Sequence, residues 1–217
     1  MLQTVYHGSS VVVEKPQWGK GRSYNDYGAG FYLTKNKALA GEWAVFATGH
    51  DGYINEYLLD CAGLNVLNLG ALPVENWIAV LMSNRRGEHR DEIHERISKF
   101  VSTYGFDTDM YDIIEGWRGD DSFFGYVRSF SLGFLSIEKL HEAMKLGDLG
   151  MQICLKSKRA FEAVEFVKSH QAQSDVYYKT AVEKDRTARR AFREMKNRDR
   201  GRNIFEILGN GQSHGRV

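Results

Sequence analysis

Three short segments of the chain place polar or aromatic side chains in a strand-like context. The first is Tyr6-His7-Gly8-Ser9, the second runs from Gly28 to Thr34 and contains Tyr32, and the third is Met151-Gln152-Ile153. Together they offer an imidazole, a phenol ring and a carboxamide, groups that bind hydroxyls and flat rings. Taken singly, such residues are more often a structural histidine, a core tyrosine and a solvent-facing glutamine.

The motifs of several common sites are incomplete. Gly28-Ala29-Gly30 begins a dinucleotide-binding pattern, but Leu33 stands where the third glycine belongs, and no helix opens there. No lysine loop of the Walker type is found either. His89 and His94 are five positions apart and would lie on different faces of a helix. We therefore expect neither a Rossmann site nor a metal site.

The composition predicts one ordinary globular domain, or a domain with a tail. The 217 residues are 42% hydrophobic, and 29 Lys+Arg against 28 Asp+Glu give a net charge of +1. No overall electric field would therefore attract a polyanion or a membrane. Cys61 and Cys154 lack the spacing of a zinc site, and no stretch has the length of a membrane span. These features favour a cytoplasmic protein that makes no contact with a membrane.

Apolar patterning predicts a mixed fold in which the three segments lie on or beside strands. The expected strands are Leu2 to His7, Gly30 to Leu33, Tyr53 to Asp60, Leu64 to Leu69, Met110 to Gly116 and Met151 to Leu155. The third and fourth of these strands are expected to pair as a hairpin. The expected helices start near Thr34, Pro73, Glu92, Asp120 or Asp121, Ser136, Ser157 and Thr180. The Ser136 helix should close at Gly147, and the Ser157 helix should carry Val164 and Val167 on its inner face.

Positive charge gathers near the C-terminus. Residues 179–202 hold ten Lys/Arg against four Asp/Glu. This segment would contact the phosphates of a nucleic acid or another anionic partner, or it is a solvated amphipathic helix of mixed charge.

The order of the three segments resembles the ADP-ribosyltransferase fold of the histidine-tyrosine-glutamate class, and most closely a bacterial family of uncharacterised domains catalogued as DUF3990. The resemblance covers roughly Tyr6 to Phe166 and also rests on Trp43-Ala44 and on residues 112–116. It implies an α+β fold, namely an ADP-ribosyltransferase-like split β-sandwich with flanking helices over residues 1–170. A basic helical extension over residues 171–217 would pack on this domain or trail it. NAD+ would be held in the cleft as the co-substrate.

The resemblance also implies roles for individual residues. His7 would hydrogen-bond a ribose hydroxyl, the Gly8 backbone would meet the nicotinamide amide, and Tyr32 would stack on the nicotinamide ring. Gly30 would leave space for that ring to enter. The expected NAD+-binding residues are His7, Gly8, Ser9, Gly30, Phe31 and Tyr32.

The third segment departs from the active pattern of that class, in which a glutamate accepts from the ribose 2′-hydroxyl and stabilises the ribosyl cation. Gln152 can hold the hydroxyl but carries no charge, and a strong electrostatic group of this kind contributes about 3 kcal/mol. Asp120, Asp121 or Glu115 would supply the missing carboxylate, although helix capping accounts for one of the two aspartates. The expected catalytic residues are His7, Tyr32, Gln152 and Asp120.

Four functions are consistent with these observations. The resemblance implies a mono-ADP-ribosyltransferase that modifies a protein or nucleic acid, as a bacterial or phage toxin or effector with a cognate antitoxin or inhibitor. An NAD+ glycohydrolase would use the same site. The neutral Gln152 instead favours a non-catalytic module that binds a nucleotide or a partner. A phosphate-transferring enzyme acting on RNA would want arginine near the first two segments, where Arg22 is the candidate.

Overall fold

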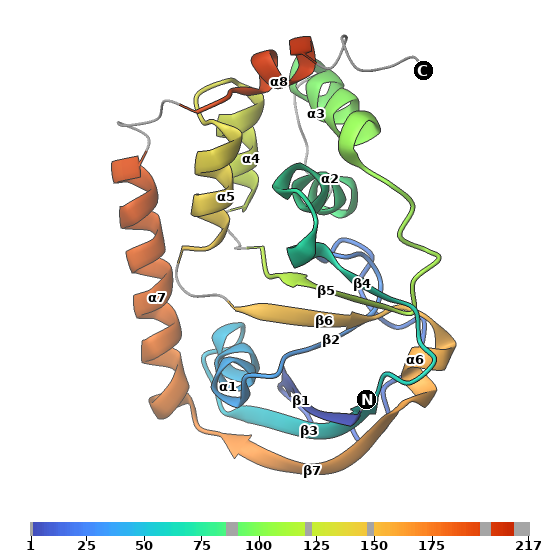
Figure 1. Ribbon diagram of the computed structural model, residues 1–217. Helices are drawn as coiled ribbons and strands as arrows, with labels where there is room; N and C mark the ends of the chain where they lie inside the picture. Colours follow the sequence, from blue (N-terminus) through green and yellow to red (C-terminus); the bar gives the residue numbers. More distant parts are fainter. Residues whose placement is uncertain (1, 86–90, 120–122, 147–149, 196–200, 211–217) are drawn as a thin grey trace.

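Two β-sheets and the helices around them make up the α+β structure of the protein (Figure 1). The computed structural model describes residues 2–85, 91–119, 123–146, 150–195 and 201–210. The strands are β1 (Leu2–Ser9), β2 (Phe31–Leu33), β3 (Gly52–Asp60), β4 (Val66–Asn68), β5 (Ile113–Trp117), β6 (Met151–Leu155) and β7 (Val164–Ala172). The helices are α1 (Lys37–Phe46), α2 (Val74–Asn84), α3 (Asp91–Tyr104), α4 (Phe123–Ser131), α5 (Ile137–Met144), α6 (Lys158–Glu162), α7 (Ser174–Met195) and α8 (Ile204–Asn210).

The sheets have different strand orders. One sheet has the order β1-β3-β7 and is antiparallel, and the other has the order β2-β6-β5-β4, in which β4 and β5 are parallel. An isolated bridge between Tyr6 and Thr34 joins β1 to the end of β2. The segment Tyr6-His7-Gly8-Ser9 and the segment from Gly28 to Thr34 therefore lie side by side where the two sheets meet.

Apolar side chains fill the space between the sheets and beneath the helices. Val5 and Tyr57 of one sheet and Leu33 and Ile153 of the other belong to one buried cluster. A larger cluster joins the four-stranded sheet to the helices above it, α2 to α5 (Figure 1). The four-stranded sheet carries Tyr32 and Gln152. Apolar side chains of the two clusters are buried against this sheet, and their burial holds it in place.

Two predictions about strands were wrong. Tyr53 to Asp60 and Leu64 to Leu69 do not form a hairpin, because β3 pairs with β1 and β7 while β4 pairs with β5 in the other sheet. The helix predicted after Ser157 ends at Glu162, and the residues beyond it form β7. Val164 and Val167 therefore lie on a strand, where the pairing of β7 with β3 overrides the helical spacing; Val164 lies opposite Leu59, and Val167 is the extra residue at a bulge.

The start of α1 also differs from the prediction. Asn36 caps this helix, since its Oδ1 accepts from the backbone N–H groups of Ala38 (3.0 Å) and Leu39 (3.2 Å). The hydroxyl of Thr34 instead donates to the Met151 carbonyl oxygen at 3.0 Å. Thr34 therefore ties β2 to β6 and leaves the capping to Asn36.

Other helix starts agree in part. The Ser136 cap is confirmed, because its Oγ accepts from the Lys139 N–H at 3.1 Å. Pro73 occupies the position before α2 rather than its first turn. The Thr180 cap was wrong, because α7 begins six residues earlier, at Ser174. The predicted caps at residues 120 and 121 and the end at residue 147 lie outside the described residues.

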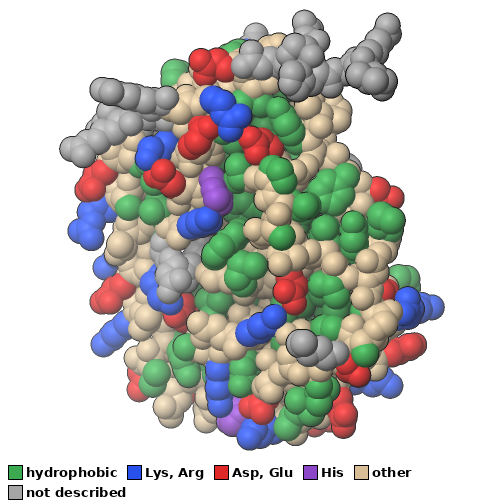
Figure 2. Space-filling view, in the orientation of Figure 1, with side chains coloured by type: hydrophobic (Ala, Val, Ile, Leu, Met, Phe, Trp, Pro, Cys, Tyr) green, Lys and Arg blue, Asp and Glu red, His purple; other side chains and the backbone are tan. Residues whose placement is uncertain are grey.

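The C-terminal helices share the core of the rest of the chain. Phe192 of α7 and Ile204 and Ile207 of α8 lie in the large cluster, and the boundary expected after residue 170 falls inside β7. Within α7, six Lys/Arg accompany four Asp/Glu, and Figure 2 shows both charges interspersed along this edge. Of the helices in the described ranges, none combines the length and apolar character needed to cross a membrane.

Candidate functional site

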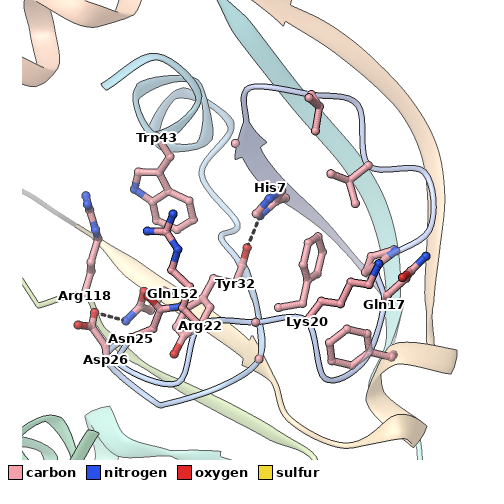
Figure 3. A pocket seen from close by; sticks show the side chains of 18 of the residues that line it. His7, Gln17, Lys20, Arg22, Asn25, Asp26, Tyr32, Trp43, Arg118 and Gln152 are labelled. Atoms are coloured by element: carbon pink, nitrogen blue, oxygen red, sulfur yellow. Dashed lines mark hydrogen bonds between the residues drawn. The ribbon is translucent and has the colours of Figure 1, made fainter. Parts of the chain in front are cut away.

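A cavity of about 890 Å³ is lined by residues of both β1 and β2, close to the bridge that joins these strands (Figure 3). Its wall includes side chains from β1, β2, α1 and β6, together with the loop over residues 11–30. Five of the six residues expected to bind NAD+ line it, and so does Gln152. The three segments that stood apart in the sequence are therefore brought together by the fold.

His7 projects from β1 toward β2. Its Nδ1 lies 2.7 Å from the Tyr32 carbonyl oxygen, and its ring lies 4.4 Å, between centroids, from that of Phe31. Because a carbonyl only accepts, Nδ1 carries the proton, and Nε2 of the neutral ring is left as an acceptor. Burial lowers the pKa of His7, an effect that the hydrogen bond to Tyr32 opposes. The imidazole is therefore neutral near pH 7.

Tyr32 lies opposite Cys154 in the pairing of β2 with β6. Its hydroxyl donates to the Gly28 carbonyl oxygen (2.7 Å) and accepts from the Tyr27 N–H (2.9 Å). Burial raises the pKa of Tyr32 well above its usual range, so the phenol stays protonated. The hydroxyl thus fixes the preceding loop, and the ring forms part of the cavity wall.

Two glycines at the cavity are required by packing. A Cβ added at Gly30 would lie 2.4 Å from Cys154 Sγ, and one added at Gly8 would lie 1.8 Å from the Ala40 carbonyl oxygen. The glycines let β2 approach β6 and let β1 approach α1. The space that Gly30 was expected to leave for a ring is thus also demanded by the neighbouring strand.

Gln152 lies at the start of β6 and is 4% exposed. Its Nε2 donates to Oδ2 of Asp26 at 2.6 Å, a contact drawn as a dashed line in Figure 3. Asp26 is 3% exposed, accepts a second hydrogen bond from the Gly119 N–H at 2.8 Å, and forms an ion pair with Arg85 at 2.6 Å between Oδ1 and Nε. A carboxylate therefore lies beside Gln152, but it comes from an unexpected part of the chain.

Glu115, another carboxylate considered for this role, does not occupy this position. Glu115 lies opposite Ile153, one residue from the Gly116 that faces Gln152, so it points to the other face of the sheet. Its carboxylate is 3.5 Å from Lys35 Nζ. Asp120 and Asp121 lie outside the described residues.

Ser9 differs from the other residues expected to bind NAD+. Its hydroxyl donates to the Val11 carbonyl oxygen (2.7 Å) and accepts from Asn55 Nδ2 (3.0 Å). These bonds fix the end of β1 and the start of the following loop, so Ser9 supports the site from outside the cavity wall.

The cavity is rich in positive charge. Asp26 is the acidic residue in the described lining, and the basic ones are Lys15, Lys20, Arg22, Arg85 and Arg118. The Arg118 guanidinium lies 5.5 Å from the centre of the Trp43 ring, a cation–π distance. Such a lining attracts an anionic ligand and suits phosphate groups.

Sequence reasoning missed Asp26 and Arg85. Asp26 lies in a glycine-rich loop where Asn25-Asp26-Tyr27-Gly28 reads as an ordinary turn, and Arg85 follows the last residue of α2. Neither position carries a local signal, because each acquires its partner only when distant segments pack together.

A family model described as a protein of unknown function (DUF3990) matches residues 3–166. This chain belongs to the DUF3990 family. The match confirms that part of the resemblance, and it runs from β1 into β7, so it includes every cavity residue discussed above. Searches of curated proteins and of solved structures gave no significant match to this DUF3990 chain.

Proposed function

We propose that this protein binds NAD+ in the cavity and cleaves the bond between nicotinamide and ribose, as a mono-ADP-ribosyltransferase built on a split β-sandwich. One observation carries the proposal: His7, Tyr32 and Gln152, from three different strands, line the same cavity. The cavity volume of about 890 Å³ lies within the range of cofactor sites, roughly 300–1,000 Å³.

The proposed reaction breaks the C1′–N bond, whose electron pair leaves with nicotinamide and whose ribose carbon becomes cationic. The neutral Nε2 of His7 accepts from one ribose hydroxyl, and the Gln152 carboxamide holds another. The Tyr32 ring packs against nicotinamide, while the basic lining binds the pyrophosphate.

In the second half of the reaction a nucleophile on a protein or nucleic acid attacks C1′ and releases a proton. Water as the nucleophile would make the same site an NAD+ glycohydrolase. A nucleotide-binding module without chemistry is the second candidate, and one observation favours it: the side chain at the third position, Gln152, is neutral.

The decisive experiment incubates the purified protein with NAD+ labelled in the ADP-ribose part, with and without cell lysate, and measures free nicotinamide. Wild type should release nicotinamide, and His7→Ala and Tyr32→Ala should abolish the release. His50→Ala and Gln171→Ala are matched controls on exposed residues and should retain it. Label on protein or nucleic acid indicates a transferase, and free ADP-ribose indicates a glycohydrolase.

A thermal unfolding measurement with NAD+ separates the binding module from a protein that has no affinity for NAD+. A ligand at 100 times its Kd stabilises the folded state by about 2.7 kcal/mol. NAD+-dependent stabilisation without nicotinamide release would favour the binding module. The absence of both effects would refute the proposed site altogether.

A further inference from the structure

The carboxylate of Asp26 is unusual for its burial and for the donors around it. Among the described residues, three donors contact it: Gln152 Nε2 at 2.6 Å, the Gly119 N–H at 2.8 Å and Arg85 Nε at 2.6 Å. These donors and the ion pair with Arg85 compensate the buried carboxylate for its loss of water. The side-chain amide of Gln152 is therefore hydrogen-bonded to a negative charge inside the cavity wall.

This contact fixes the direction of the Gln152 amide. An ionised carboxylate only accepts hydrogen bonds, so the amide nitrogen must face Asp26. The carbonyl oxygen then points away from Asp26 and is the group that Gln152 can offer to a ligand in the cavity it lines. Without Asp26, the amide could turn and present a donor instead.

The same contact polarises the amide. A hydrogen bond to an ion is shorter and stronger than one between neutral groups, and hydrogen bonds in series polarise one another. The negative charge on Asp26 therefore increases the electron density on the carbonyl oxygen of Gln152. A neutral side chain gains part of the acceptor character that a carboxylate would have.

We propose that Asp26 is a positioning residue that, through the amide of Gln152, orients and polarises an acceptor for a ribose hydroxyl of the bound dinucleotide. The inference rests on the proposed function. Asp26 and Gln152 together take the place of a single carboxylate, and the ion pair with Arg85 holds Asp26 in the buried wall.

The proposal makes a counterintuitive prediction about Gln152→Glu, the substitution that the resemblance would recommend. It would place a second carboxylate against Asp26, at a site where the two groups are now 2.6 Å apart. Two like charges at such a distance cannot both ionise readily, so the pair would retain a proton. Gln152→Glu alone should therefore lower nicotinamide release, by about 100-fold.

The test compares Asp26→Asn, Gln152→Glu and the double variant in the nicotinamide assay. Asp26→Asn should also lose about 100-fold, because the amide of Gln152 is no longer held. In the double variant an amide again faces a carboxylate, so release should be at least about tenfold above that of Gln152→Glu. Independent effects would instead multiply, and a double variant as weak as their product would overturn the proposal.

A pH series of thermal unfolding supplies a readout that does not depend on NAD+. In Gln152→Glu the shared proton raises a carboxyl pKa in the folded state, so its melting temperature should rise relative to wild type as the pH falls from about 8 to about 5. The double variant should lack this rise. If Asp26→Asn does not fold, Gln152→Glu across this series still decides whether the two groups are coupled, and a flat series overturns the proposal.

A matched pair on the surface serves as the control. Asp51 accepts from Gln171 Nε2 at 3.1 Å, and both residues are exposed. Asp51→Asn and Gln171→Glu should leave nicotinamide release unchanged. A wild type that neither releases nicotinamide nor gains stability with NAD+ refutes the proposed function and this inference with it. An active wild type with an equally active Asp26→Asn refutes the inference alone.

Discussion

The contact between β1 and α1 at Gly8 predicts a large effect from one added methyl group. A Cβ at Gly8 would lie 1.8 Å from the Ala40 carbonyl oxygen and 2.8 Å from the Ala44 backbone nitrogen. Both atoms belong to the backbone of α1, so no side chain can turn aside to make room. In Gly8→Ala the helix would have to move by more than an ångström, and Trp43, which lines the cavity from α1, would move with it.

Overpacking of this kind costs about 3 kcal/mol, the upper end of the usual range, because rigid backbone rather than a side chain must yield. For a chain of this size, each kcal/mol corresponds to roughly 2–4 °C, so Gly8→Ala should melt about 6–12 °C below wild type. Scanning calorimetry at pH 7 measures the difference. NAD+-dependent stabilisation should weaken in the same variant, because the cavity wall is displaced.

Gly125→Ala is the matched control. Gly125 lies in α4, is exposed, and a Cβ built there meets no described atom within 4 Å. Alanine restricts the unfolded chain and favours a helix, so this variant should be more stable than wild type by about 0.4–1 kcal/mol. If Gly8→Ala melts at the temperature of wild type, the packing of α1 on β1 described above is incorrect.

Two further predictions concern pH and a structural carboxylate. The folded-state pKa of His7 is lowered by burial, so the unfolded chain binds the proton more strongly and stability should decline as the pH falls below about 6.5. Chemical denaturation at about pH 5 and pH 7.5 should show this decline in wild type and a smaller one in His7→Asn; equal declines would contradict a buried neutral imidazole. Asp112 accepts from Ser157 Oγ (2.5 Å) and the Asn65 N–H (2.9 Å), and these bonds lower its pKa. Its contribution is present above about pH 3.8 and is lost as the pH falls through the lowered value. Asp112→Asn should cost about 1–3 kcal/mol near pH 7 and make the protein less sensitive to acid, which urea titrations across this range would measure.

Much of the secondary structure could be read from local pattern. The limits predicted for Met151 to Leu155 agree with β6, and Ser136 caps α5 as expected. These signals work because capping and apolar density act within a few residues. Val164 shows the limit of such reasoning, since its helical spacing was overruled by pairing with Leu59, in a strand about a hundred residues earlier in the chain.

Residue types and their order along the chain were enough to single out His7, Tyr32 and Gln152 as candidate site residues and to indicate the DUF3990 family. Only the tertiary structure placed His7, Tyr32 and Gln152 around one cavity and brought Asp26 from a loop to the side of Gln152. The reason is physical: a buried carboxylate is defined by the donors that surround it. Those donors belong to Gln152, Gly119 and Arg85, which lie far from Asp26 and from one another in the sequence.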